Sequence, residues 1–245
     1  MLSAIEDAPK TYARVGGALY LTIIAAGVFA ELFVRDRLTV SFDAAATATN
    51  IVAHSSLLRL GIAADLLTFV LAIPLTLILY VLLRPVSKDL ALLAVMLNLV
   101  QDAIGGMNAL NTYRPLQLLG GANYLSAFSR EQLQAMALLS LKAHSVGFAV
   151  ALIFFGVYCV VLGYLIYRSG FLPRTLGALL AVTGISYLVI SRAVILSPRV
   201  SSVVFPLIAP VAFVGELSVA LWLTVKGVNV ARWQEASGLN SREHG

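Results

Sequence analysis

The chain has 245 residues, of which 60% are hydrophobic and 12% are charged, with a formal net charge of +5. Soluble domains carry about 25% charged residues, and a water-soluble fold of this length has too little interior to hide so much apolar surface. The basic residues stand singly or in pairs at the ends of apolar runs. That pattern argues against a nucleic-acid-binding protein, in which they would form a patch with interleaved aromatic residues, and is typical of membrane topology signals.

Six apolar segments are long enough to cross a bilayer, which takes about 20 mostly apolar residues. The first is too long for the apolar core of a cleavable signal peptide, so we expect it to stay in the protein. The sequence therefore predicts an all-α, polytopic membrane helix bundle with about six transmembrane helices. In chain order the predicted spans are residues 15–34, 58–83, 90–112, 144–167, 176–196 and 203–225.

Lysine and arginine residues predict the orientation, because cytoplasmic loops carry an excess of them. Nine would lie on one side: Lys10, Arg14, Arg84, Lys88, Arg168, Arg174, Lys226, Arg232 and Arg242. Five would lie in the loops of the other side: Arg35, Arg37, Arg114, Arg130 and Arg199. We therefore expect both termini to be cytoplasmic. The predicted parts are an N-terminal segment (1–13), a six-helix transmembrane domain (14–226) and a flexible C-terminal tail (227–245).

Both long outer loops contain helix-start signals. Asp43 is suited to cap a helix over Ala44–Ala53. Ser129 is followed three residues later by Gln132, the spacing of a capping box. A helix that begins there would continue into the fourth span.

Ionisable side chains inside the predicted spans are costly and indicate function by default. Their depths place them in the outer half of the membrane, and helical spacing places the acids beside small residues that let helices approach closely. We predict that Asp65, Asp102 and Glu216 point into a shared cavity, with Arg59, His144 or Arg192 nearby. The complete candidate cluster is Glu31, Arg59, Asp65, Asn98, Asp102, Asn108, His144, Arg192 and Glu216.

Several chemistries fit such a cluster, and the cofactor is unknown. It could bind or transport a small molecule, an ion or a lipid, for example as a proton relay through the carboxyl groups. Asp65, Asp102, His144 and Glu216 are candidate ligands for a divalent metal ion. Alternatively, Arg59, Arg192 and His144 could hold a lipid or quinone head group. A further alternative is a membrane-embedded redox enzyme that uses a metal, haem or quinone in the same pocket. In a purely structural interpretation, the acids pair with Arg59, Arg192 and Lys142 and lock the helices together.

The chain has a single cysteine, Cys159, so an internal disulfide is impossible. The sequence also contains no metal-spacing motif, phosphate loop or nucleophile elbow. We therefore expect a non-enzymatic protein whose partners are the lipid bilayer and a small ligand, with no nucleic acid.

Three stretches resemble the bacterial membrane family called domain of unknown function 4386. They are residues 58–65 (LRLGIAAD), 163–174 (GYLIYRSGFLPR) and 215–222 (GELSVALW), and the similarity covers about residues 10–230. The resemblance implies a multi-pass protein of the bacterial inner membrane, and no activity comes with it. Where the family has a second histidine in its fourth helix, this chain has Tyr158, which weakens a metal or haem interpretation.

Overall fold

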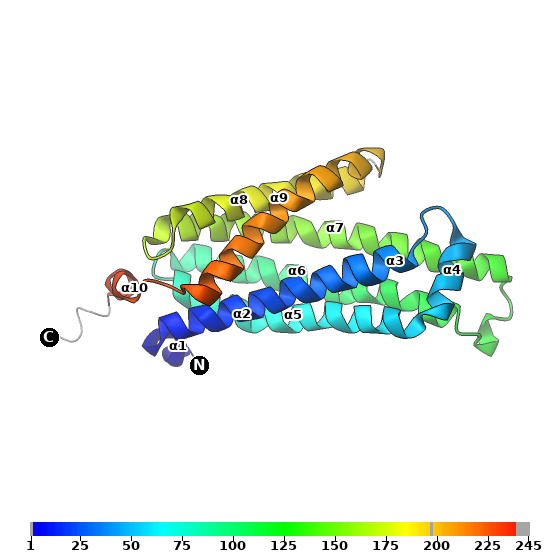
Figure 1. The fold of residues 1–245 in the computed structure, drawn as a ribbon, viewed down its shortest axis with the longest axis horizontal. Coiled ribbons are helices and arrows are strands. Elements are labelled where there is room, and N and C mark those ends of the chain that lie inside the picture. The colour runs from blue at the N-terminus through cyan, green and yellow to red at the C-terminus, as the bar shows by residue number, and fades with distance from the viewer. Residues whose placement is uncertain (1, 197, 239–245) are drawn as a thin grey trace. The chain divides into compact units, whose positions relative to one another are not determined.

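The computed structural model describes residues 2–196 and 198–238, and every regular element in them is a helix, as predicted (Figure 1). The elements are α1 (Leu2–Asp7), α2 (Pro9–Val28), the π-helix η1 (Phe29–Arg35), α3 (Asp36–Leu38), α4 (Ala44–Ala53), α5 (Ser55–Leu83), α6 (Lys88–Leu118), the 3₁₀-helix η2 (Asn123–Leu125), α7 (Arg130–Ser169), α8 (Arg174–Leu196), α9 (Pro198–Val225) and α10 (Val230–Ser237).

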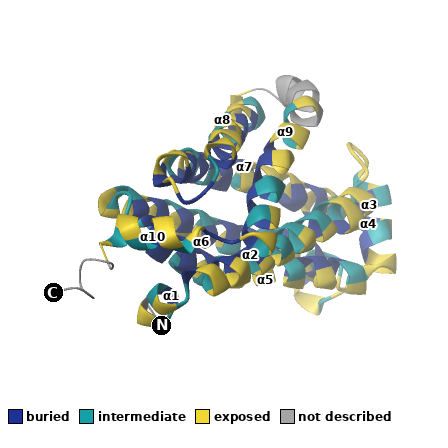
Figure 2. Cartoon of the chain, turned by 60° about the vertical axis from the view of Figure 1, so that its left-hand side comes forward, coloured by how far each residue is buried: buried dark blue, intermediate teal, exposed yellow. Residues whose placement is uncertain are grey.

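Six of the described helices are long and apolar enough to cross a membrane, which confirms the predicted bundle class. They cover Pro9–Leu38, Ser55–Leu83, Lys88–Leu118, Arg130–Ser169, Arg174–Leu196 and Leu207–Val225. Large apolar side chains on these helices are more than half exposed, such as Phe33, Val70 and Met107, and exposed residues recur along the helices in Figure 2. Water penalises such a surface, whereas lipid accepts it. The chain is thus built as a multi-pass integral membrane protein.

The chain forms two compact units, and four helices contribute to both. Unit 1 comprises Met1–Thr22, Leu71–Asp102 and Ala149–Gly245, and unit 2 comprises Ile23–Val70 and Ala103–Phe148. Helices α2, α5, α6 and α7 each contain residues of the two units.

Within unit 1, α7 and α8 pack closely because glycines face each other. A Cβ atom on Gly177 would lie 2.5 Å from the carbonyl oxygen of Gly163, closer than real Cβ contacts allow. Helix α9 packs beside α8, and the Thr183 hydroxyl donates a hydrogen bond to the carbonyl oxygen of Ala212 at 3.1 Å. In lipid, close packing of small residues drives helix association, since the hydrophobic effect does not.

One end of unit 1 is closed by the two short terminal helices. Glu6 on α1 forms an ion pair with Arg84, at the turn after α5. Asn229 caps α10, and the indole nitrogen of the buried Trp233 donates to the carbonyl oxygen of Leu82 at 2.9 Å. The sequence predicted a flexible tail after residue 226. In the structure, Val230–Ser237 instead form a helix that one aromatic side chain anchors. Residues 239–245 of that tail lie outside the described residues.

Unit 2 has its own apolar core under the loop that joins α3 to α4. The buried members are Val34, Leu38, Ile51, Leu58, Ile62, Leu116 and Leu141. Both predicted helix caps are confirmed here. The Asp43 carboxylate accepts from the backbone N–H of Ala46 at 2.8 Å, and Ser129 and Gln132 exchange reciprocal hydrogen bonds of 3.3 and 2.8 Å.

The glycine contact between α7 and α8 gives a stability prediction. Gly177→Ala adds a Cβ where backbone already lies, so we expect it to lower the free energy of unfolding in detergent by about 1–3 kcal/mol, the usual cost of overpacking. Gly106→Ala is the matched control, because a Cβ there meets nothing within 4 Å. Equal stability of the two variants would contradict the packing described for unit 1.

Candidate functional site

Glu216 is a buried carboxyl in the middle of α9, and two tyrosines hold it. The Tyr20 hydroxyl, on α2, donates to one carboxyl oxygen at 3.1 Å, and the Tyr187 hydroxyl, on α8, donates to the other. Three spans of unit 1 thus meet at one acid. Its described hydrogen-bond partners are neutral, so the charge of an ionised Glu216 would have no positive side chain bonded to it.

Asp102 is the second buried carboxyl of unit 1, and it lies on α6. The side-chain nitrogen of Asn98, one turn earlier, donates to Asp102 at 2.9 Å and to the Thr76 hydroxyl of α5 at 2.9 Å. All three polar side chains are buried. As at Glu216, the hydrogen-bond partner of the carboxyl is uncharged: it is the amide of Asn98, which also donates to the Thr76 hydroxyl.

Tyr158 on α7 joins the surroundings of the two acids. It is buried and lines a small cavity together with Thr76. Phe155 stacks on Tyr158 with ring centroids 5.5 Å apart and contacts the Tyr187 ring at the same distance. We name these side chains the carboxyl cluster: Tyr20, Thr76, Asn98, Asp102, Tyr158, Tyr187 and Glu216.

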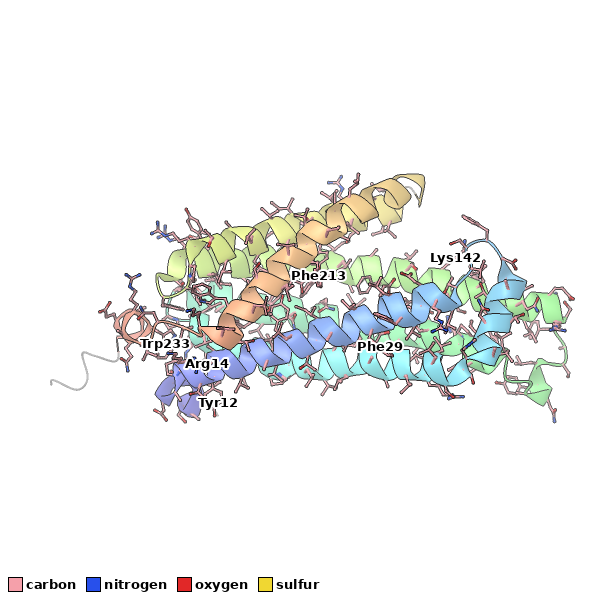
Figure 3. All side chains as sticks on the ribbon, in the orientation of Figure 1. Tyr12, Arg14, Phe29, Lys142, Phe213 and Trp233 are labelled. Atoms are coloured by element: carbon pink, nitrogen blue, oxygen red, sulfur yellow. The ribbon has the colours of Figure 1, made fainter. Side chains whose placement is uncertain are left out.

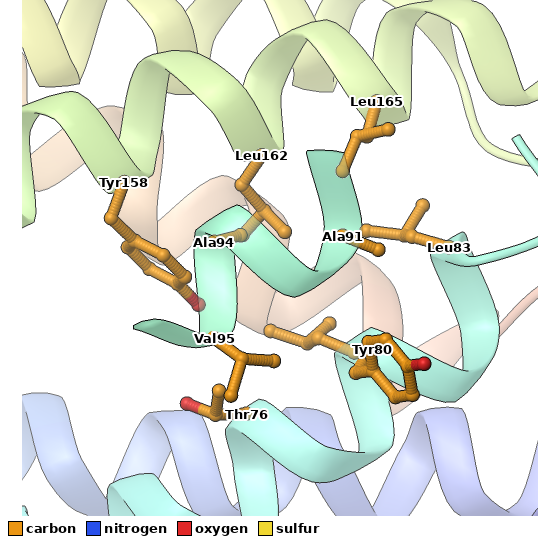
Figure 4. Close-up of a pocket in the computed structure, with 10 residues that line it drawn as sticks. Thr76, Tyr80, Leu83, Ala91, Ala94, Val95, Tyr158, Leu162 and Leu165 are labelled. Atoms are coloured by element: carbon orange, nitrogen blue, oxygen red, sulfur yellow. The ribbon is translucent and has the colours of Figure 1, made fainter. Parts of the chain in front are cut away.

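A narrow cavity begins at this cluster. Thr76 and Tyr158 line one end, and Leu83, Ala91 and Leu165 line the other, close to where α5 and α7 end (Figure 4). Its volume is about 10 Å³, at the lower limit for one water molecule. The far end of the cavity lies near the ends of α5 and α7, and the outward-opening pocket predicted from the sequence stays a prediction.

In unit 2 the acidic side chains are paired with a cation, whereas in unit 1 they accept hydrogen bonds from neutral groups. Arg35 donates to Glu31 at 2.7 Å and also pairs with Asp65 on α5. Only 12% of the Arg35 side chain and 13% of the Asp65 side chain are exposed, so this pair is largely desolvated. Glu31 and Arg35 both lie in the π-helix η1, a rare conformation that is frequent at functional sites.

His144, on α7, completes the polar groups of unit 2. Its Nδ1 atom lies 3.0 Å from the Thr112 hydroxyl and 3.1 Å from the side-chain nitrogen of Asn108, both on α6. The imidazole also interacts electrostatically with Asp65 and Arg35. His144 is therefore a hydrogen-bonded member of the same polar region as the arginine pair.

The structure divides the single predicted cluster between the two units. Unit 1 contains Asn98, Asp102, Arg192 and Glu216, and unit 2 contains Glu31, Arg59, Asp65, Asn108 and His144. Arg59 and Arg192, two of the three basic residues predicted near the acids, are exposed on their helices. The four candidate metal ligands, Asp65, Asp102, His144 and Glu216, belong to different hydrogen-bond networks. Within the described ranges, no three His, Cys, Asp or Glu residues are placed to hold a metal ion.

Two hydrogen-bond partners of the acids, Arg35 and Tyr187, were not predicted from the sequence. Arg35 was assigned to an outer loop because the first span was ended at residue 34, and helix in fact continues through Leu38. Tyr187 was not predicted, because the predicted cluster was built from charged, amide and imidazole side chains and contained no hydroxyl groups. The available signal was its place on α8, four residues after Thr183, which faces α9.

The buried pair in unit 2 gives a second stability prediction. Arg35→Gln leaves Asp65 without its cation, so we expect a loss of about 3–5 kcal/mol in the free energy of unfolding. Arg37→Gln, two residues later and exposed, should change stability little. Adding Asp65→Asn to Arg35→Gln should recover part of the loss. If the double variant is no more stable than Arg35→Gln alone, the proposed pairing does not carry the effect.

Comparisons with known proteins agree with the sequence resemblance. The family model described as Domain of unknown function (DUF4386) matches residues 15–227. The chain is also 30% identical, over 162 residues, to an uncharacterized protein of Archaeoglobus fulgidus, an alignment that covers 66% of this chain and 80% of that protein. No solved structure matches. The chain belongs to the family described as domain of unknown function DUF4386.

Proposed function

We propose that the protein is an ion carrier whose ion is the proton, bound in the membrane by Glu216 and Asp102. The observation that carries the proposal is the environment of Glu216. This carboxyl is buried in a membrane span, and its described hydrogen-bond donors are two tyrosine hydroxyls. Intramembrane acids of this kind mark proton relays and ion pathways.

The neutral partners favour a titrating acid over a structural ion pair. Removing an ion from water costs several kcal/mol, and a nearby opposite charge can offset that cost. Around Glu216 and Asp102 the described donors are hydroxyl and amide groups, which do not neutralise a charge. Binding a proton removes the charge altogether. The same hydroxyl groups can donate to a carboxylate or accept from a carboxylic acid, so both forms keep hydrogen bonds.

The carboxyl cluster also offers a route. Tyr158 lines the small cavity together with Thr76, and the Thr76 hydroxyl accepts a hydrogen bond from Asn98. The small cavity then continues from Thr76 and Tyr158 toward the ends of α5 and α7. A proton released from either acid would thus find hydroxyl groups first, and the cavity beyond them, about 10 Å³ and lined mostly by apolar side chains, holds one water molecule at most.

The alternatives receive unequal support. The purely structural interpretation suits unit 2, where Arg35 neutralises Glu31 and Asp65 and ties η1 to α5. A redox enzyme with a protein-bound metal lacks a comparable geometric argument in the part of the chain that the structure describes.

Proton flux into proteoliposomes under an imposed membrane potential tests the proposal. We expect Glu216→Gln to reduce the flux to the level of protein-free vesicles, because the amide cannot exchange a proton. Tyr187→Phe, which removes one of the two hydroxyl donors, should lower the flux by about tenfold if the lost bond contributes about 1.5 kcal/mol to the transfer step.

The matched control is Glu235→Gln, which makes the same chemical change at an exposed position of α10. It should conduct like the wild type. Equal fluxes from the wild type and Glu216→Gln, with both variants folded and inserted to the same extent, would refute the proposal.

A further inference from the structure

A second and larger cavity lies at the end of unit 1, away from the carboxyl cluster. Its volume is about 490 Å³, within the range of ligand sites, about 300–1,000 Å³. Three parts of the chain build it: α1, the turn between α5 and α6, and α10. The lining residues are Glu6, Arg84, Pro85, Lys88, Trp233, Ala236 and Ser237.

The lining presents positive charge at a helix start. Lys88 is the first residue of α6, so its ammonium group adds to the positive end of the helix dipole, which Asp89 in the first turn and the Ser87 hydroxyl, accepting from the N–H of Leu90, partly offset. Arg84 adds a guanidinium, whose planar fork of donors suits phosphate and carboxylate. Glu6 pairs with Arg84, so an anionic ligand bound at this guanidinium would have to take the place of a carboxylate.

The surroundings place the cavity at the level of a membrane surface. Arg84 and Lys88 flank the short turn between two spans. Four acidic residues, Glu6, Asp7, Asp89 and Glu235, lie among eight basic ones at this end of unit 1, which are Lys10, Arg14, Arg84, Lys88, Arg168, Arg174, Lys226 and Arg232.

Trp233, buried at the wall of the cavity, lies at the same end as Arg14 (Figure 3). A buried tryptophan and clustered cations at a span end are features of sites for anionic lipid head groups.

We propose that this cavity binds the phosphate group of an anionic lipid head group, through Arg84 and Lys88. The Glu6 carboxylate occupies the guanidinium in the absence of lipid, and the phosphate displaces it. The lipid is favoured over free phosphate because Arg84 and Lys88 lie at the ends of two spans, the level at which lipid head groups are expected. This cavity contains no residue of the carboxyl cluster, so the lipid proposal can be tested separately from the proton proposal.

Native mass spectrometry of the detergent-solubilised chain, titrated with phosphatidylglycerol or with phosphatidylcholine of the same acyl chains, tests the site. We expect the wild type to prefer phosphatidylglycerol. Arg84→Gln/Lys88→Gln should weaken its binding by at least about tenfold, the effect of losing one charged hydrogen bond of about 1.5 kcal/mol. Glu6→Gln should instead tighten binding, because it removes the competing carboxylate.

Two further variants make the test specific. Arg168→Gln/Arg174→Gln removes the same charge from exposed positions at the same end, outside the cavity, and should change the affinity less than about threefold, as expected for screened surface charges. Lys88→Gln alone keeps the Arg84–Glu6 pair intact and should still weaken binding, so a loss of folding cannot account for the result.

Three results would overturn the site. If the two double variants weaken phosphatidylglycerol binding equally, the lipid is attracted by the overall positive charge of this end and not bound in the cavity. Equal affinity for the two lipids would show that the phosphatidylglycerol charge is not recognised. Displacement of phosphatidylglycerol by inorganic phosphate at similar concentrations would identify the free ion, and not the lipid, as the ligand.

Discussion

The absence of water in the bilayer interior is the constraint on which this structure depends. Every polar atom that a membrane helix buries must find its hydrogen bond inside the protein, since an unsatisfied group costs several kcal/mol. The chain meets this condition: among the described residues, no buried side-chain nitrogen or oxygen lacks a hydrogen-bond partner. Both units obey the rule, and they do so with different chemistry.

In unit 2 the partner is a cation. Arg35 serves Glu31 and Asp65 at once, and it is held by the π-helix that turns it toward α5. Such a pair is stable only as a pair, because removing one member leaves a buried charge. In unit 1 the partners are neutral, with tyrosine hydroxyls at Glu216 and an asparagine amide at Asp102. This second arrangement tolerates a change of protonation, which is why the proposed ion binding is assigned to unit 1.

The spans and helix caps could be predicted from the sequence because their signals are local. Apolar length predicts a span, and an acceptor side chain before a helix predicts a cap, as at Asp43 and Ser129. Depth along each helix also identified Asp102, His144 and Glu216 as buried groups.

Partners could not be predicted, because they depend on which helices become neighbours and on the rotation of each helix. Arg59 and Arg192 lie at suitable depths but on exposed faces. Arg35 is the last residue of the π-helical segment η1, in which side-chain directions differ from regular α-helical spacing. Trp233 lies in a short amphipathic helix after the last span, and its partner, the carbonyl oxygen of Leu82, is far away in the sequence, so the anchoring role is visible only in that contact.

Infrared difference spectroscopy of the protein in lipid, recorded across a step in bulk pH, tests the central claim most directly. If Glu216 exchanges a proton, a carboxyl stretching band should change with the step in the wild type and be missing from Glu216→Gln. A wild-type spectrum in which no pH-dependent carboxyl band is lost on that substitution would contradict proton binding at this site.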